Sequence, residues 1–197
     1  MPRYTVNLPH RVYVPTPNEY GESTPDALVV HCECCHYCSV GDNLTIFVDG
    51  ACPGNGTPKA RAGMGVYFYE DCPMNISTPL LEGPFTNQRA ELCPAIAALE
   101  TVQDLIIQDA LGIPFKGVVL VSDSAYLVNA VTDWITKWSR NGWKNSEGRP
   151  VANMDDILKL DGLVGWLEAN HLPVRFWRVD RSQNTYADIL AKQAVAL

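Results

Sequence analysis

A short apolar segment between two predicted helices constrains the fold of this chain more than any other feature. Four consecutive apolar residues, Val118–Val121, end at Ser122. A strand with one face in water alternates apolar and polar residues, whereas a strand that is buried on both faces carries an uninterrupted apolar run. We therefore expect this strand inside a sheet that is flanked by helices, which is an α/β architecture.

The chain from Asn43 onward shows a regular order of strand and helix patterns. Leu92, Ile96, Leu99 and Ile106 recur at helical spacing and predict a long helix. The predicted strands cover 44–48, 63–69, 80–85, 118–122 and 174–179, and the predicted helices cover 88–110, 124–138, 154–170 and 185–196. The first three strands are expected to form an antiparallel meander.

Residues 1–42 differ from the rest and predict an extension on a domain that covers 43–197. Five prolines interrupt any regular element in this segment, at positions 2, 9, 15, 17 and 25. The segment also carries two basic residues against five acidic ones. We expect it to wrap on the domain as an irregular extension.

Composition excludes several classes of protein. Hydrophobic residues make up 47% of the 197 residues and charged residues 19%, so the chain can bury a sizeable core. No apolar run approaches the roughly 20 residues that span a bilayer, and the N-terminus lacks the basic-then-apolar pattern of a signal peptide. Seven cysteines without a signal peptide predict reduced thiols, and their odd number argues against a complete set of disulfides. Reduced thiols indicate a location in the cytoplasm or nucleus.

Four acidic residues stand at the edges of predicted elements: Asp49, Glu91, Asp123 and Asp188. Asp49 and Asp123 follow predicted strands, whereas Glu91 and Asp188 lie near the starts of predicted helices. If the fold gathers these carboxylates, they repel one another unless cations lie between them, and hard divalent ions such as Mg²⁺ prefer carboxylate oxygen. The pattern therefore indicates metal-assisted chemistry on phosphates.

Each acid by itself also has a structural interpretation. Asp49 with the glycine after it is a common turn at the end of a strand. Glu91 alone is a solvated helix residue, and Asp123 is a candidate N-cap of the next helix. Asp188 follows Thr185 by three positions, as in a capping box. Four such positions in this order of strands and helices favour the catalytic interpretation.

The order of elements and the phrases around the four acids resemble those of type 1 ribonuclease H. The resemblance runs from about Asn43 to the end of the sequence and rests on ordered phrases at 49–55, 62–66, 86–92, 122–126, 134–144 and 184–191. It implies a ribonuclease H-like α/β fold, in which a five-stranded mixed sheet, an antiparallel meander plus two parallel strands, is flanked by helices. It also implies an endonuclease that hydrolyses the RNA strand of RNA–DNA hybrids and leaves 5′-phosphate products.

In the family that the chain resembles, these acids hold two Mg²⁺ ions, for which Mn²⁺ can substitute. The resemblance makes Asp49 the residue that bridges both ions. Glu91 and Asp123 complete one coordination sphere, and Asp188 holds the other ion. One ion activates the attacking water, and the other stabilises the leaving 3′ oxygen.

The resemblance also implies which residues bind the two strands of a hybrid. Asn55, Asn87 and Gln88 are expected to contact the RNA strand, because an amide can both donate to and accept from a 2′-hydroxyl. Thr86 and Asn153 match positions that hold a phosphate of the DNA strand. The alternative is that Thr86 or Asn87 only caps the following helix.

A basic, tryptophan-containing stretch covers 134–150. Lys137 and Lys144, with two arginines nearby, resemble the basic protrusion with which the family binds the backbone of the hybrid. Tyr126 and Trp134 are expected to line the channel of the DNA strand. The alternative is that the tryptophans pack the helix and the cations are only solvated. A local positive field of this kind lets a chain of net charge −7 bind nucleic acid.

Two departures from the family pattern concern the site. The loop 179–188 has no histidine, although many members carry one there. The loop resembles a variant that active members of the family carry. Arg181 is then a candidate for a fixed cation near the scissile phosphate. The alternative is that Arg181 only pairs with a surface acid. Asn184 is expected to cap the last helix. Beside the phosphate of the DNA strand, Pro84-Phe85 stand where an arginine often lies.

A cysteine- and histidine-rich segment lies in the extension, at 31–38. Cys32, Cys35 and Cys38 are candidate zinc ligands, and His36 or His31 is a candidate for the fourth ligand. However, no second Cys-x₂-Cys pair follows at the usual distance, and one tight turn rarely delivers four tetrahedral ligands. We therefore favour packed or redox-sensitive thiols over a zinc site.

The main prediction is a ribonuclease H that acts on RNA–DNA hybrids as a monomer, without membrane association. A retroelement-derived nuclease of the same fold is a close alternative, which only genomic context distinguishes. From another class, the alternative is a catalytically weak hybrid-binding or protein-interaction module, in which the extension covers the cleft. Mg²⁺-dependent cleavage of a hybrid discriminates between the enzyme and the module.

Overall fold

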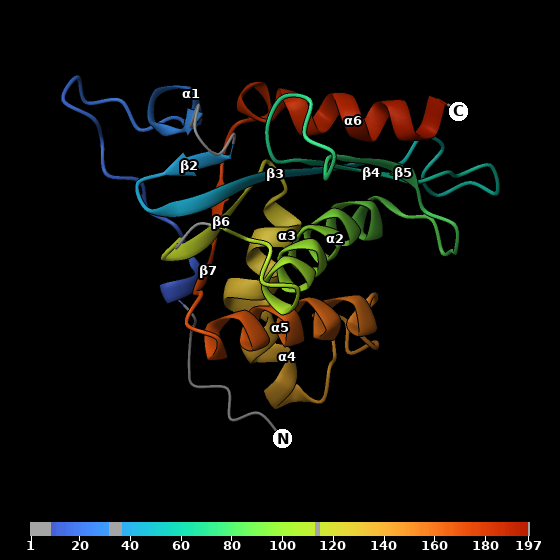
Figure 1. The fold of residues 1–197 in the computed structure, drawn as a ribbon. Coiled ribbons are helices and arrows are strands. Elements are labelled where there is room, and N and C mark those ends of the chain that lie inside the picture. The colour runs from blue at the N-terminus through green and yellow to red at the C-terminus, as the bar shows by residue number, and fades with distance from the viewer. Residues whose placement is uncertain (1–8, 32–36, 113–114, 197) are drawn as a thin grey trace.

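The computed structural model describes residues 9–31, 37–112 and 115–196, which form one seven-stranded sheet with helices on both faces (Figure 1). The strands are β1 (Val30–His31), β2 (Cys38–Val40), β3 (Asn43–Ala51), β4 (Gly63–Tyr67), β5 (Ile76–Pro79), β6 (Gly117–Ser122) and β7 (Val174–Arg178). The α-helices are α1 (Pro25–Leu28), α2 (Asn87–Ile107), α3 (Ala125–Asn129), α4 (Ile135–Asn141), α5 (Met154–Ala169) and α6 (Thr185–Ala196). The other helical turns are η1 (Pro9–Arg11), η2 (Ala130–Trp134) and η3 (Arg181–Gln183). None of the helices in these ranges is both long and apolar enough to cross a membrane.

Strand β3 lies at the centre of the sheet. It pairs antiparallel with β4 and parallel with β6, and β7 extends the parallel side. Strand β5 extends the antiparallel side. These five strands therefore run in the order β5-β4-β3-β6-β7, which confirms the predicted mixed sheet of a meander and two parallel strands.

The third strand of the meander lies earlier in the chain than the sequence predicts. The prediction at 80–85 is wrong, because the strand that pairs with β4 is Ile76–Pro79. Its β-branched residues favour a strand, whereas the glycine–proline pair inside 80–85 removes a backbone donor. The N–H of Leu80 donates to Ala62 O at 2.7 Å, one residue beyond the strand.

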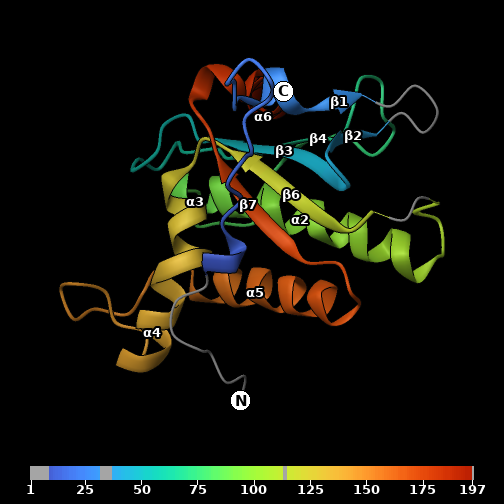
Figure 2. The same ribbon diagram turned by 90° about the vertical axis from the view of Figure 1, so that its left-hand side faces the viewer.

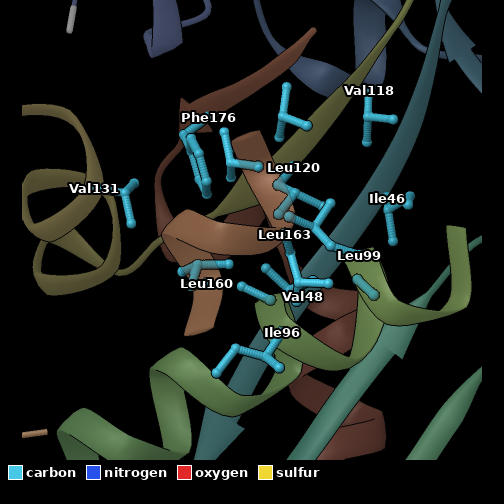
Figure 3. Packing of buried hydrophobic residues seen from close by; sticks show 14 of the residues in the cluster. Ile46, Val48, Ile96, Leu99, Val118, Leu120, Val131, Leu160, Leu163 and Phe176 are labelled. Carbon is cyan, nitrogen blue, oxygen red and sulfur yellow. The ribbon is translucent and has the colours of Figure 1, made fainter. Parts of the chain in front are cut away.

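Strand β6 is buried at all six positions, as its apolar run predicts. Val118 and Leu120 pack in the larger core cluster, on the face of the sheet that α2 and α5 cover (Figure 3). Val119 and Val121 pack in a second cluster with Ala187 of α6 on the opposite face. Because both faces of β6 are covered, apolar residues follow one another from Val118 to Val121 without alternating polar residues.

The helices form two layers around the sheet. Figure 1 shows α6 on one side and α2 to α5 on the other, and Figure 2 shows the same layers from the side. Helix α2 contacts β3 and β4, whereas α6 contacts β3, β4 and β5. The single helix predicted at 124–138 is divided into α3, the π-helical turn η2 and α4. The two faces of β3 are thus covered by the two helices that carry Glu91 and Asp188.

The extension contributes two short strands to the sheet, which the sequence does not predict. Strands β1 and β2 form an antiparallel pair, and Val40 of β2 pairs with Asn43 at the start of β3. Since Asn43 pairs with β6 on its other edge, β2 lies on the same edge of β3 as β4. The prolines therefore divide the extension into short elements rather than excluding them.

The first described residues of the extension lie against β7 and α5. Arg11 is buried, and its Nη1 donates to Asp161 Oδ1 at 2.6 Å and to Val131 O at 3.4 Å. The N–H of Tyr13 donates to Phe176 O of β7 at 3.0 Å. The extension therefore contacts the domain both at the parallel edge of the sheet and beside β3.

Candidate active site

Asp49 lies inside β3, which continues to Ala51, so Asp49-Gly50 is not the turn that the dipeptide suggests. The glycine serves a close approach of two backbones instead. A Cβ on Gly50 would lie 1.9 Å from Ala90 O, in the first turn of α2. Only a residue without Cβ leaves this space, and the contact brings β3 against the turn that carries Glu91.

A second glycine lets α6 approach the sheet in the same way. Gly65 of β4 pairs with Asp49 in the sheet register, and a Cβ on Gly65 would lie 2.2 Å from Ala187 O. Ala187 directly precedes Asp188 in the first turn of α6. The close packing of α6 on β4 therefore holds Asp188 over the pair of strands that contains Asp49.

Asp123 follows β6 directly and lies at the same end of the sheet as Asp49. Strands β3 and β6 are parallel, and Phe47 pairs with Val121. Asp49 and Asp123 each stand two residues beyond that pair, and parallel neighbours present their carboxyl ends at one edge. The register thus brings together the two acids that the sequence places at strand ends.

Burial and neighbouring charges act together on Asp49, which is 8% exposed. Desolvation and, after it, the Asp123 carboxylate raise the pKa of Asp49 from its ordinary 3.8 to about 7. Asp188 adds to this rise, whereas the backbone N–H of Gly50 and the charge of Arg181 oppose it. Carboxylates influence one another in this way only at short range, so the three aspartates share one electrostatic site.

Glu91 joins the group from α2. Ser124 Oγ donates to Glu91 Oε2 at 2.7 Å, and the same oxygen accepts from Leu127 N at 3.0 Å as the N-cap of α3. Burial raises the pKa of Glu91, the hydrogen bond from Ser124 opposes the rise, and the Asp123 carboxylate adds to it. The cap of this helix is therefore Ser124, which leaves Asp123 free of the capping role.

Asp188 accepts hydrogen bonds from Arg181 Nη2 at 2.7 Å and from Lys192 Nζ at 2.5 Å. Partial burial acts to raise the pKa of Asp188, but these two cations hold it below its ordinary value. The pKa of Arg181 is raised first by its hydrogen bond to Asp188 and further by the charges of Asp49 and Asp123. Arg181 therefore faces the acidic group itself rather than an unrelated surface acid.

The donor set of this group suits hard divalent cations. Carboxylate oxygens are the ligands that Mg²⁺ prefers, and a cation offsets repulsion between carboxylates. Among the described residues, no three acidic, histidine or cysteine side chains are oriented so that they could hold a metal ion together. Glu91, Asp123 and Asp188 are each oriented by hydrogen bonds from other side chains of the protein. The residues thus fit divalent ions by their chemistry.

Of the residues predicted to contact RNA, Asn87 and Gln88 lie at the start of α2 and Asn55 lies in the loop after β3. The N–H of Asn87 donates to Asn55 Oδ1 at 3.1 Å, which joins the loop after β3 to this helix. Asn55, Asn87 and Gln88 are all exposed. Thr86 is the N-cap of α2, and its Oγ1 accepts from Arg89 N at 3.2 Å. The capping interpretation of Thr86 is therefore confirmed, and the contacts with the two strands stay predictions.

Two residues predicted to face the DNA strand contact each other. Asn153 Nδ2 donates to Tyr126 Oη at 3.4 Å, and Asn153 has a left-handed φ of 60° directly before α5. The ring of Tyr126 begins a row of aromatic side chains. Its centroid lies 5.8 Å from that of Trp134, which lies 5.6 Å from that of Trp138. These rings are only partly buried, so the row has an accessible side.

The basic side chains predicted to bind the backbone are exposed. Lys137 of α4 pairs with Asp133, with Nζ 2.5 Å from Oδ2. Lys144 lies in the loop after α4, where the side chain of Asn141 bonds both the N–H and the carbonyl of Lys144. The loop also contains Arg149, which pairs with a glutamate two residues before it. The stretch thus presents its cations to solvent.

Most of the candidate zinc ligands, namely Cys32, Cys35 and His36, lie outside the described residues. Cys38 is the first residue of β2 and is buried. Burial, with a smaller effect of Cys72, raises the pKa of the Cys38 thiol to about 11. A thiol with a raised pKa yields the metal-binding thiolate less readily. Cys38 therefore fits the interpretation of a packed thiol.

Three supporting residues were missed or given another role by sequence reasoning. Ser124 and Lys192 hold Glu91 and Asp188, and the i, i+4 spacing of Asp188 and Lys192 on one helix could have indicated the second pair. The sequence predicts that Asn184 caps α6, whereas its Nδ2 donates to Asp123. Nothing local separates these two roles of an asparagine.

Comparison with known proteins identifies one family. The sequence model of the RNase H family matches residues 41–196. Ribonuclease H1 of Mus musculus is 34% identical over 181 residues, which cover 91% of this chain and 59% of that protein. Ribonuclease H of Schizosaccharomyces pombe is 36% identical over 156 residues, which cover 79% of this chain and 54% of that protein. The chain thus spans a little over half the length of these relatives.

Solved structures share the fold. LC11-RNase H1 in complex with an RNA/DNA hybrid has a TM-score of 0.54 and 21% identity, and the match covers 77% of this chain and 96% of that one. LC9-RNase H1, described as a type 1 RNase H with the type 2 active-site motif, has a TM-score of 0.52 and 26% identity, with 77% and 71% covered. The mixed sheet and its flanking helices are therefore those of the ribonuclease H fold.

Proposed function

The chain belongs to the ribonuclease H family, and we propose that it is an endonuclease that hydrolyses the RNA strand of RNA–DNA hybrids. The observation that carries the proposal is the electrostatic group of acids from β3, α2, β6 and α6. Burial, Asp123 and Asp188 together raise the pKa of Asp49 to about 7. Such a group weakens the fold, because burial and repulsion both disfavour charge, and strongly perturbed carboxylates of this kind are typical of active sites.

We assign the four acids to a pair of Mg²⁺ ions, for which Mn²⁺ can substitute. Ribonucleases H use divalent metal ions, which activate a water and stabilise a leaving oxygen when they are bound. Asp49 is coupled to both Asp123 and Asp188, so we assign it to both ions. Glu91 and Asp123 would complete one ligand set, and Asp188 would hold the other ion.

Other side chains of the protein orient the acids and the phosphate. Ser124 and Lys192 donate to Glu91 and Asp188, and each donor favours the ionised form of the carboxylate that it contacts. Arg181 sets a permanent positive charge beside Asp188, where it attracts the scissile phosphate. Attack of water on the scissile phosphorus and departure of the 3′ oxygen leave a 5′-phosphate on one RNA product and a 3′-hydroxyl on the other.

The exposed surface beside the acids supplies binding of the hybrid. Solved relatives of this fold include one in complex with an RNA/DNA hybrid, which supports the same substrate here. Contacts with the RNA strand are assigned to Asn55, Asn87 and Gln88. Contacts with the DNA strand are assigned to Thr86, Tyr126, Trp134 and Asn153, and contacts with the backbone to Lys137 and Lys144.

The experiment is cleavage of labelled nucleic acids by the purified chain in Mg²⁺ or Mn²⁺. We expect cleavage of the RNA strand in a hybrid, with 5′-phosphate ends, and none of double-stranded or single-stranded RNA. Asp49→Asn and Asp123→Asn should each abolish hydrolysis and still unfold cooperatively, because each removes a metal ligand without changing the shape of the side chain.

The matched control is Asp104→Asn, which changes an exposed acid on α2, the helix that carries Glu91. It should keep the wild-type rate. Turnover like that of wild type in Asp49→Asn or Asp123→Asn would exclude the assignment. Binding of the hybrid without any cleavage by the wild-type chain would instead favour the hybrid-binding module.

A further inference from the structure

Asn184 links three parts of the candidate active site. It lies between η3 and the first residue of α6 and is fully buried. Its Nδ2 donates to Val48 O at 3.0 Å and to Asp123 Oδ1 at 2.9 Å. One amide group therefore connects the loop before α6 to β3 and to the acid that follows β6.

The neighbours of Asn184 determine the orientation of its amide. Both partners of the NH₂ group, a backbone carbonyl and a carboxylate, can only accept hydrogen bonds, so the reversed orientation would face oxygen with oxygen. The Oδ1 atom points elsewhere, and none of the described residues donates a hydrogen bond to it. Burial of an amide with an unused acceptor costs free energy, so a contribution to stability does not by itself explain an asparagine at this position.

We propose that Asn184 is a positioning residue, which sets the orientation of the Asp123 carboxylate relative to Asp49. The inference rests on the proposed function, in which Asp123 is a metal ligand. Val48, the second partner of the amide, directly precedes Asp49, so the amide ties Asp123 to the backbone that carries Asp49. Partners that orient a metal ligand affect metal affinity and rate although they touch neither metal nor substrate.

The charge of the donor supports this role. Asp188 accepts from two cations, which lower its pKa. Asn184 is neutral, so it orients Asp123 while leaving the negative charge of the carboxylate for a cation. Ser124 is a neutral donor to Glu91 in the same manner. The two acids assigned to one ligand set are thus both held by neutral donors.

Asn184→Ala tests the inference, and Asn75→Ala is its matched control. The side chain of Asn75 also makes two hydrogen bonds, with Phe68 N at 2.8 Å and with Tyr69 O at 2.7 Å, in the turn between β4 and β5. Two quantities are measured on each protein. The first is kcat and KM for a labelled hybrid, and the second is the Kd of the free protein for Mg²⁺, calculated from the rise of its thermal midpoint with MgCl₂ concentration.

We expect Asn184→Ala to lower kcat and to raise the Kd for Mg²⁺, each by about 10- to 100-fold. The KM for the hybrid should stay unchanged, because the buried amide does not face the duplex. Asn75→Ala should leave kcat and the Mg²⁺ response as in wild type. In an Asp123→Asn background, adding Asn184→Ala should not shift the Mg²⁺ response further, because the effect passes through Asp123.

Other results would contradict the positioning role of Asn184. If Asn184→Ala matches Asn75→Ala in kcat and in the Mg²⁺ response, Asn184 serves the fold alone and the inference is wrong. If Asn184→Ala does not unfold cooperatively, Asn184→Ser takes its place, since a hydroxyl has one donor for two acceptors. A serine variant with wild-type kcat would then overturn the inference. Absence of cleavage by the wild-type chain refutes the proposed function, while the Mg²⁺ responses still decide the role of Asn184.

Discussion

Asp49 shows how one residue can weaken the fold at neutral pH. Its pKa is raised in the folded protein to about 7, first by burial and then by Asp123, whereas its ordinary value is 3.8. Between these values the unfolded chain has released the proton and the folded protein still holds it. Stability in the absence of metal must therefore fall as pH rises through this window, and the loss is complete above pH 7.

We predict that Asp49→Asn removes this pH dependence. Measured by denaturant unfolding in EDTA, the variant should gain on wild type as pH rises from 4 to 8, by up to about 4 kcal/mol, the equivalent of the raised pKa. Comparison with the variant cancels the titration of groups that do not interact with Asp49. A constant difference in stability between the two proteins across this range would show that the fold does not penalise the Asp49 charge.

At the scale of elements, two helices reach the acids because strand glycines let them approach. Gly50→Ala should push the first turn of α2 from β3, since its Cβ would lie 1.9 Å from Ala90 O. We predict a loss of about 1–3 kcal/mol in the free energy of unfolding and a lower kcat, because Glu91 moves with the helix. Denaturant unfolding and hybrid cleavage measure both effects.

The control is Gly162→Ala, in α5, where a Cβ meets nothing within 4 Å. It should stabilise the helix by about 0.5–1 kcal/mol and leave kcat unchanged. If Gly50→Ala were as stable and as active as Gly162→Ala, the close approach of α2 and β3 would not matter for the site.

The basic stretch at α4 and in the following loop leads to a prediction about the affinity for the hybrid and its salt dependence. Lys137→Ala and Lys144→Ala should each weaken binding of the hybrid and reduce the slope of log Kd against log salt by about 1, because each removes one phosphate contact. Values of kcat at saturating hybrid should stay near wild type. Fluorescence anisotropy at several NaCl concentrations, with catalytically inactive Asp123→Asn as the background, measures the slope.

Lys116→Ala is the control for charge alone. Lys116 stands before β6, at the opposite end of that strand from Asp123, and pairs with Asp42. Its loss should leave the salt dependence unchanged. Equal slopes for Lys116→Ala and Lys144→Ala would mean that the protein binds the hybrid through its overall charge rather than through this stretch.

For the whole molecule, the extension is held to the domain by a buried ion pair. Arg11 Nη1 lies 2.6 Å from Asp161 Oδ1, with both side chains under 10% exposed, and its Nε lies 3.7 Å from Glu168 Oε1. A buried ion pair stabilises a fold little more than apolar residues in the same place would, but removal of one partner leaves an unpaired buried charge and is costly. The pair therefore makes the position of the extension sensitive to a single substitution.

We predict that Arg11→Met destabilises the protein by about 3–5 kcal/mol, whereas the double variant with Asp161→Leu recovers most of the loss. Thermal and denaturant unfolding measure the cycle. Lys116→Met, which breaks an exposed pair, should cause no measurable change. If Arg11→Met and Lys116→Met unfold alike, Arg11 contributes nothing to the attachment of the extension.

Sequence patterns predict most of the sheet, with one strand misplaced and one hairpin missed. The strands around Val48 and Val119 and the helices α2, α5 and α6 are found, because burial of one face or of both leaves a period in the sequence. The strand Ile76–Pro79 is too short and polar to leave such a period. Strands β1 and β2 have two and three residues and form only by pairing with each other and with β3.

The sequence by itself predicts the chemistry that we propose for this protein, because the four acids and their local phrases can be recognised without their neighbours in space. Only the tertiary structure decided how the acids are held. The donors Ser124, Asn184 and Lys192 act across or along elements through contacts of 2.5 to 2.9 Å, and the glycines Gly50 and Gly65 act by the absence of a side chain against another element. Such contacts depend on the register and packing of segments far apart in the chain, which leave no local period to read.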